Sequence, residues 1–176
     1  MQYLTEIATD PRIVAIGETG IDKLKGPSYD IQIPVFEKHI ALSESLKKPL
    51  IIHCVKAWDE LIRVRRQSQP SQPWIIHGYR SNPELTKRLI KEGFMFSVGD
   101  KINIESLALI PLDSLFCETD EDEMDIRDVY MQAALALNMN LEDFADRIAQ
   151  NVHRIFPTLQ PPKPFDPEEM KEVQEE

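Results

Sequence analysis

Carboxylates and histidines stand at the ends of four apolar runs in the sequence. In chain order these residues are Glu18, His53, His77 and Asp120. Two carboxylates and two imidazoles are donors that suit a divalent cation of the Zn, Mn or Mg type. Because parallel strands bring their carboxyl ends to one edge of a barrel, the four side chains are predicted to form a metal-dependent hydrolytic site.

A cation at such a site would lower the pKa of bound water from about 15.7 toward ~7 to 9, which supplies hydroxide near neutral pH. The same residues have plainer interpretations as well. A strand-end histidine can be a hydrogen-bonded core residue, Glu18 can be a paired buried carboxylate, and Asp120 can cap the helix that follows it. The equivalent positions of His53 and His77 on successive runs favour metal binding.

The elements that must position these residues alternate between strand and helix. Apolar β-branched runs predict strands at residues 13–16, 50–53, 74–77, 94–98 and 115–118, with a turn at Gly17 and Gly20 after the first. Apolar residues at helical spacing predict helices at 28–47, 57–67, 83–92, 125–138 and 141–155, the third capped by Asn82. This alternation predicts a parallel sheet with right-handed crossovers.

Length and composition indicate a single domain. A chain of 176 residues can bury one core. No apolar run approaches the roughly 20 residues of a membrane helix, so no membrane association is expected. The N-terminus lacks the basic start and apolar core of a secretion signal. Cys117 lies within a predicted strand and Cys54 directly follows one, which fits a reducing compartment, so a cytoplasmic location is expected.

The chain is acidic, with a formal net charge of -10. This charge disfavours broad nucleic-acid binding, because it repels phosphate backbones at long range. Residues 161–176 are rich in proline and glutamate and contain few apolar groups. Burial of such a segment cannot offset its ordering entropy, so we expect a domain of residues 1–160 followed by a disordered acidic tail.

Several motifs, in order, resemble those of the TatD family of metal-dependent hydrolases. Gly17–Asp22 is similar to the GEIGLD signature of that family, and Gln32 with Phe36 is similar to its QxxxF pattern. Further segments that resemble family motifs are Leu46–His53, Ile75–Tyr79, Phe94–Gly99, Leu115–Asp120 and Asn151–Phe156. The resemblance covers residues 12–157.

The resemblance implies an α/β fold, a TIM-barrel-like parallel (β/α) barrel. It also implies that Glu18 bridges two divalent cations, that His53 and His77 bind one, and that Asp120 binds the other while holding the attacking water. Glu18 and Asp120 are thus the implied catalytic residues. The implied reaction is hydrolysis of a phosphodiester, as in a DNase.

The chain departs from the family pattern in three respects. Family members carry an H-x-H pair on their first strand, and the 176 residues contain none. With five predicted strands, the chain is expected to lack the first one or two βα units, to bind one cation, and to self-associate through the open barrel edge. The acidic run Glu121–Asp125 would repel a polyanion. Val55 and Lys56 stand where the family has an arginine two residues beyond the histidine, and Gly78–Ser81 replaces its C-F-S-G segment, so Lys56 and Arg80 are candidates for phosphate contacts, with surface basic residues as the plainer interpretation.

Two functional hypotheses therefore stay open. The first is a TatD-like hydrolase. The second is a catalytically impaired remnant that preserves the fold and binds a metal or a protein partner. The sequence does not choose a substrate within the first hypothesis, because esters, amides and phosphodiesters can all be cleaved by the same metal chemistry.

Overall fold

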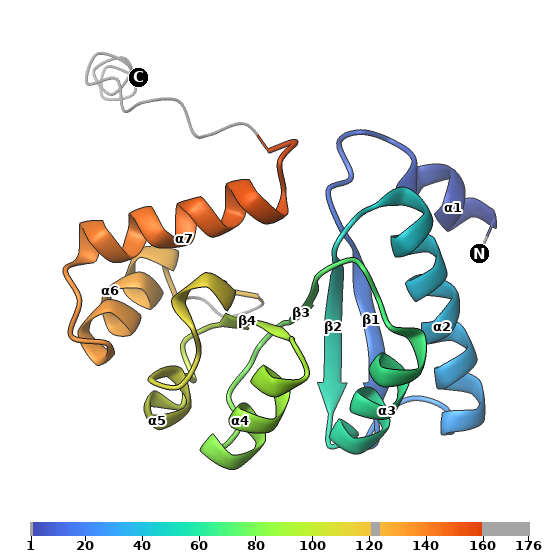
Figure 1. Ribbon diagram of the computed structural model, residues 1–176, viewed down its shortest axis with the longest axis horizontal. Coiled ribbons are helices and arrows are strands. Elements are labelled where there is room, and N and C mark those ends of the chain that lie inside the picture. The colour runs from blue at the N-terminus through green and yellow to red at the C-terminus, as the bar shows by residue number, and fades with distance from the viewer. Residues whose placement is uncertain (1, 121–123, 160–176) are drawn as a thin grey trace, which may run out of the picture.

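The structure, a computed structural model, describes residues 2–120 and 124–159 (Figure 1). Its strands are β1 (Ile16–Asp22), β2 (Leu50–Val55), β3 (Trp74–Ile76), β4 (Met95–Val98) and β5 (Leu115–Cys117). Its helices are α1 (Gln2–Ala8), α2 (Tyr29–Leu46), α3 (Trp58–Ser68), α4 (Pro83–Lys91), α5 (Ile104–Leu107), α6 (Ile126–Ala136) and α7 (Leu141–Ile155), with a 3-10 turn η1 (Leu112–Ser114). The predicted tail at 161–176 and the acidic residues 121–123 lie outside the described residues.

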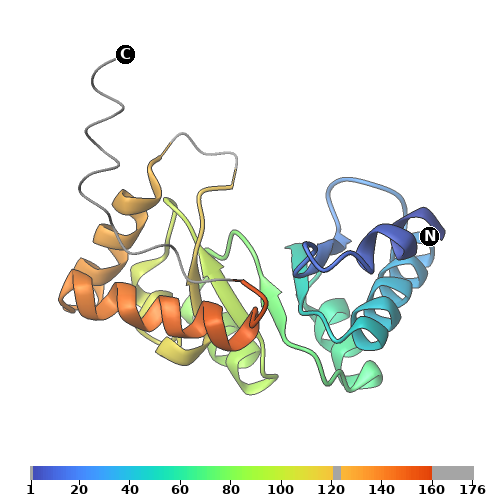
Figure 2. The same ribbon diagram turned by 90° about the horizontal axis from the view of Figure 1, so that it is seen from above.

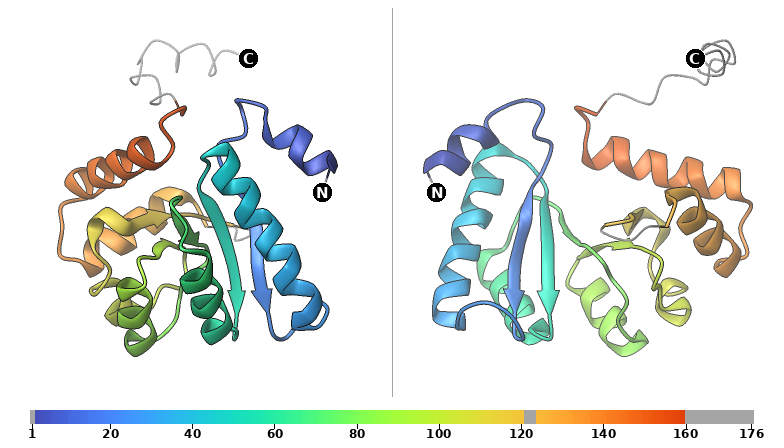
Figure 3. Two further views of the ribbon diagram at one scale, coloured as in Figure 1. Left: turned by 45° about the vertical axis from the view of Figure 1, so that its right-hand side comes forward. Right: turned by 180° about the vertical axis from the view of Figure 1, so that it is seen from behind.

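The five strands form one parallel sheet in the order β1-β2-β3-β4-β5. Strands that follow one another in both sequence and space, each joined by a helical crossover, give a TIM-barrel-like α/β fold, as predicted. Helices α2, α3 and α4 lie along one side of the curved sheet (Figure 2). Within the described residues β1 and β5 are the two edges, so the sheet is an arc (Figure 3).

The two faces of the sheet carry different side chains, because successive residues of a strand point to opposite faces. The face toward the helices holds most of the core, including the fully buried Leu50, Ile52 and Trp74. The inner face holds a smaller apolar cluster, in which Ile75 and Phe116 pack with the end of α7. His53 and His77 lie two residues after Ile51 and Ile75 of this inner face, at the carboxyl ends of the strands.

The first strand differs from its prediction. It spans Ile16–Asp22, whereas the sequence predicted a strand at 13–16 and a turn at the two glycines. Both glycines lie within the strand, because the β1 and β2 backbones approach too closely there for a side chain. A Cβ atom on Gly20 would lie 1.9 Å from the His53 carbonyl oxygen, and one on Gly17 would lie 2.7 Å from the Ile51 Cβ. These contacts fix β1 beside the strand that carries His53.

The remaining predicted strands and helices are present, with ends shifted by at most a few residues. Asn82 caps α4 as expected, because its side-chain oxygen accepts a hydrogen bond from the Leu85 amide at 3.0 Å. The short α5 and η1 were not predicted. In the described part of the chain, no helix is both long enough and apolar enough to cross a membrane.

Candidate metal centre

Three of the four predicted donors converge at the carboxyl end of the sheet. Glu18 lies on β1, His53 on β2, and His77 directly after β3. Nδ1 of His53 lies 3.1 Å from Nε2 of His77. Oε2 of Glu18 lies 3.3 Å from the same His77 nitrogen and 3.8 Å from the same His53 nitrogen. One atom from each residue thus faces a common point.

The spacing of these three atoms fits a metal ion. A triangle with sides of 3.1, 3.3 and 3.8 Å has a circumscribed circle with a radius of about 2.0 Å, and bonds from zinc to nitrogen or carboxylate oxygen are about 2.0 to 2.2 Å long. A single cation can therefore lie at bonding distance from all three atoms. Glu18, His53 and His77 form the one group of at least three potential metal ligands found among the described residues.

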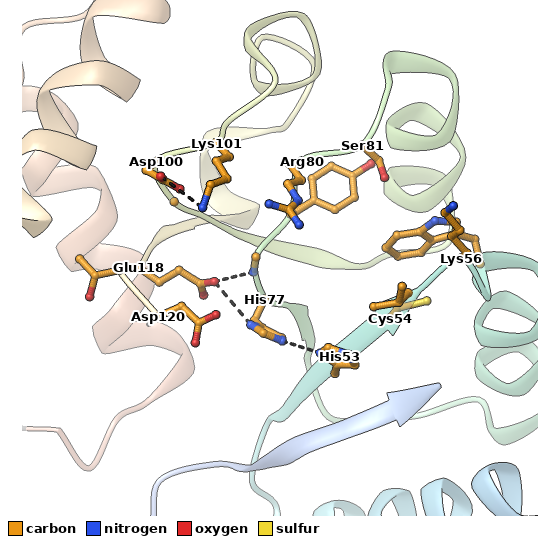
Figure 4. Close-up of a pocket in the computed structure, with 16 residues that line it drawn as sticks. His53, Cys54, Lys56, His77, Arg80, Ser81, Asp100, Lys101, Glu118 and Asp120 are labelled. Carbon is orange, nitrogen blue, oxygen red and sulfur yellow. Dashed lines mark hydrogen bonds and ion pairs between the residues drawn. The ribbon is translucent and has the colours of Figure 1, made fainter. Parts of the chain in front are cut away.

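Asp120 reaches the same end of the sheet without joining this group. It follows β5, is exposed, and lines the same cavity as His53 and His77. In Figure 4 its carboxylate lies beside Glu118, near His77. Its backbone has a φ of 48°, a left-handed conformation that non-glycine residues rarely adopt and that is enriched at functional sites. Its predicted role as a ligand of a second cation stays a prediction.

Two further carboxylates face the histidines from the other side. Oδ2 of Asp22 lies 3.5 Å from Nε2 of His53, and Oε1 of Glu118 lies 3.6 Å from Nδ1 of His77. Carboxylates commonly occupy this place behind metal-binding histidines, where they orient the ring. Neither residue was among the predicted site residues. The available signal was spacing by an even number of residues, because Asp22 lies four residues after Glu18 on β1, and Glu118 lies two residues before Asp120, directly after β5.

The electrostatics of the centre agree with this arrangement. Burial would raise the pKa of Glu118, but His77, Ser97 and the Gly78 amide together hold it below its ordinary value of 4.5. The contact with Glu118 in turn raises the pKa of His77 above its ordinary value of 6.5. Burial of His77 acts to lower this pKa, and the charges of the neighbouring carboxylates act to raise it. For Asp22, burial acts to raise the pKa, and hydrogen bonds from backbone amides followed by His53 lower it overall. The cluster is therefore rich in negative charge that can balance a cation.

A cavity of about 470 Å³ opens beside the histidines. Both residues predicted to contact phosphate line it, as do several residues without a predicted role. These cavity residues are Lys56, Arg80, Lys101, Asp100, Trp58 and Ser81 (Figure 4). Lys56 and Arg80 are exposed at the cavity, so each can reach a bound anion.

A parallel α/β sheet of barrel type with a carboxylate and two imidazoles at its carboxyl edge defines a class, the barrel metal-dependent hydrolases. A family model described as TatD-related DNase matches residues 1–157. The chain therefore belongs to the TatD-related DNase family, as the motifs predicted.

Known proteins of this kind are similar over most of the chain. An uncharacterized metal-dependent hydrolase from Buchnera aphidicola subsp. Baizongia pistaciae is 26% identical, over 87% of this chain and 66% of that protein. The human 3'-5' RNA nuclease TATDN2 is 32% identical, over 66% of this chain and 17% of the nuclease. The fold matches that of YjjV, a TatD homologue from Escherichia coli K12, with a TM-score of 0.78 and 21% identity, over 89% of this chain and 69% of YjjV. The chain thus spans about two thirds of the Buchnera protein and of YjjV.

Proposed function

We propose that this protein is a divalent-metal-dependent hydrolase that cleaves phosphodiester bonds, as a DNase does. The observation that carries the proposal is the triangle of Glu18, His53 and His77, whose three donor atoms fit one cation beside a cavity. Family membership supports the hydrolase class, and the human relative named as an RNA nuclease supports a phosphodiester substrate.

In the proposed site each group has a distinct task. Glu18, His53 and His77 would hold the cation, which supplies Lewis acidity and lowers the pKa of water when it is bound. Asp120, exposed at the cavity, would orient the attacking water and accept its proton. Lys56 and Arg80 would contact the phosphate oxygens of the substrate.

The donor set supports one tightly held cation. Three protein donors with a position left over are typical of a catalytic site, whereas Asp120 alone brings one carboxylate to a second ion. A two-metal clamp stabilises both the attacking and the leaving oxygen. We therefore expect slow turnover of phosphodiesters by the 176-residue protein.

Metal content and phosphodiesterase activity of two histidine variants test the proposal. His53→Ala removes a donor, whereas His153→Ala changes an exposed histidine of α7 and serves as the matched control. We expect about one zinc or manganese ion per chain in the wild type and in His153→Ala. In His53→Ala, metal affinity should fall by more than about 100-fold, since loss of a ligand costs more than loss of an outer-sphere partner.

Hydrolysis of bis(p-nitrophenyl) phosphate should fall with metal content in the same variants. A wild-type protein that binds no divalent cation would contradict the proposed site. A protein that binds one cation tightly and shows no hydrolysis would instead support the fold-preserving, metal-binding alternative.

A further inference from the structure

Each histidine of the metal centre directs one ring nitrogen toward the proposed cation position and the other toward a carboxylate. His53 turns Nδ1 toward the centre and Nε2 toward Asp22, while His77 turns Nε2 toward the centre and Nδ1 toward Glu118. We propose that Asp22 and Glu118 are positioning residues that fix the tautomer and the orientation of these two histidines for metal binding. The inference rests on the proposed metal centre and deepens it.

The two carboxylate oxygens of Asp22 have different partners. One accepts hydrogen bonds from backbone amides, and the other faces His53. Its Oδ1 accepts hydrogen bonds from the amides of Leu24 at 2.7 Å and Lys25 at 2.9 Å. Its Oδ2 lies 3.5 Å from the His53 ring. The carboxylate cannot rotate without breaking both backbone hydrogen bonds, so its direction is set by the loop that follows β1.

That loop is in turn held by Gln32 of α2. The Gln32 side-chain oxygen accepts a hydrogen bond from the Asp22 amide at 2.8 Å, and its Nε2 donates to the Asp22 carbonyl at 2.8 Å and to the Pro27 carbonyl. The side chain of Asp22 is only 15% exposed. A glutamine on a long helix thus fixes the backbone of the residue that faces His53.

Glu118 has an equivalent anchor on the other histidine. Its Oε1 accepts a hydrogen bond from the Gly78 amide, which is adjacent in sequence to His77 (Figure 4). The exposed fraction of the Glu118 side chain is 21%, so the contacts act in a partly desolvated place where they are stronger than in water.

The two carboxylates select which ring nitrogen carries the proton. An ionised carboxylate only accepts hydrogen bonds, so it favours an N–H on the nitrogen that faces it. The opposite nitrogen then presents its lone pair, as a metal ligand must. Asp22, at 3.5 Å, lies nearer to the His53 ring than Glu18, at 3.8 Å, and therefore favours the Nε2–H form of His53. Glu18 lies 3.3 Å from Nε2 of His77, so a cation bound at that nitrogen would leave the ring proton on Nδ1, which faces Glu118 at 3.6 Å.

Substitution of Asp22 by asparagine tests the first pair. In Asp22→Asn the side-chain oxygen must stay on the two backbone amides, so the NH₂ group faces His53 and favours a proton on Nδ1, the wrong nitrogen. Zn²⁺ affinity, measured by competition with a chromophoric chelator, should fall about 10- to 100-fold. Asp100→Asn removes a negative charge from the same cavity, where Asp100 pairs with Lys101, and should change the affinity by less than about threefold. Equal losses in the two variants would refute positioning and leave a charge effect only.

Substitutions of Glu118 test the second pair. Glu118→Gln keeps an oxygen that can accept from the Gly78 amide and from His77 Nδ1, whereas Glu118→Ala removes it. Zn²⁺ affinity should therefore fall at least about tenfold in the alanine variant and be largely retained in the glutamine variant. Equal affinity in both variants would overturn the assignment of Glu118.

The tautomer itself is measurable without metal. In chelator-treated protein, nitrogen-15 NMR of the imidazole rings should show His53 protonated on Nε2 in the wild type and on Nδ1 in Asp22→Asn. An unchanged tautomer would overturn the inference about Asp22. A wild type that shows the expected tautomer and yet binds no Zn²⁺ would refute the proposed metal centre while leaving the positioning contact intact.

Discussion

The charged residues that line the cavity are equally divided between basic and acidic side chains. The basic side chains are Lys56, Arg80 and Lys101, and the acidic ones are Asp100, Glu118 and Asp120. Three positive charges against three negative charges give no net attraction for a phosphate anion, and Glu18 adds a further negative charge at the metal centre. If the protein cleaves phosphodiesters as proposed, binding of the anionic substrate would therefore depend on the cation together with each basic residue.

Neutralising one basic residue should consequently weaken substrate binding. For Arg80→Gln or Lys56→Met we expect KM for a phosphodiester to rise about tenfold, since a charge-assisted hydrogen bond is worth about 1.5 kcal/mol. The dependence of KM on salt should also become shallower. Lys87→Gln, on the exposed side of α4, is the control and should leave KM unchanged. Equal KM values in all three variants would show that neither residue contacts the substrate.

The sequence predicted the convergence of Glu18, His53 and His77 because each ends an apolar run, and parallel strands align such ends. It did not indicate the carboxylates behind the histidines, because Asp22 and Glu118 stand within four residues of Glu18 and Asp120, which match the pattern of a strand-end metal ligand better. The choice of inward ring nitrogen could not be predicted. It depends on side-chain rotation against Asp22 and Glu118, which no pattern in the sequence encodes.

Helices α3 and α4 are joined by contacts that depend on charge. Arg66 of α3 donates from Nε to a carboxylate oxygen of Glu92 at 2.9 Å, and its Nη2 pairs with the other oxygen. The neighbouring Arg65 donates to the Glu92 carbonyl at 2.7 Å and lies over the rings of Trp74 and Phe94. The end of α4, just before β4, is thus fixed to α3.

This link predicts a pH dependence of stability. Arg66 is the main cause that lowers the pKa of Glu92 below its ordinary value of 4.5. A carboxyl group with a depressed pKa in the folded state stabilises the protein above its unfolded pKa, and this contribution is lost as the pH falls through the folded pKa. Between pH 6 and pH 3 the free energy of unfolding, measured with urea, should therefore fall less in Arg66→Gln than in the wild type. Arg63→Gln, on the same helix, should follow the wild type, and identical slopes in all three proteins would contradict the role of the pair.

Element boundaries were predictable where local signals agree with packing. The capping asparagine and following proline located the start of α4, and helical spacing located α2 and α7. The first strand was misplaced because Gly17 and Gly20 read locally as a turn. Glycine is needed at both positions because the β2 backbone lies too close for a side chain, and the β2 residues involved are more than 30 positions away in the sequence. Such long-range contacts are invisible to local patterns.

At the scale of the whole molecule, the sheet is an arc with a free edge. Strand β1 pairs with β2 alone among the described strands, and the inner face carries half-buried apolar side chains, including Ile51, Met95 and Phe156. A closed barrel of this class has eight strands, three more than the described residues contain. An edge strand next to an apolar face is a surface that proteins normally cover or pair.

We therefore predict that the 176-residue chain self-associates through this open side. Light scattering should report about twice the monomer mass of 20.3 kDa, with dissociation on dilution. Met95→Lys places a charge on the inner face and should shift the equilibrium toward monomer, because burying an unpaired charge in an interface is costly. Met131→Lys places the same charge on the exposed side of α6 and should leave the mass unchanged. A stable wild-type monomer at working concentration would contradict the prediction. A dimer that Met131→Lys disrupts and Met95→Lys does not would place the interface on the helical side instead.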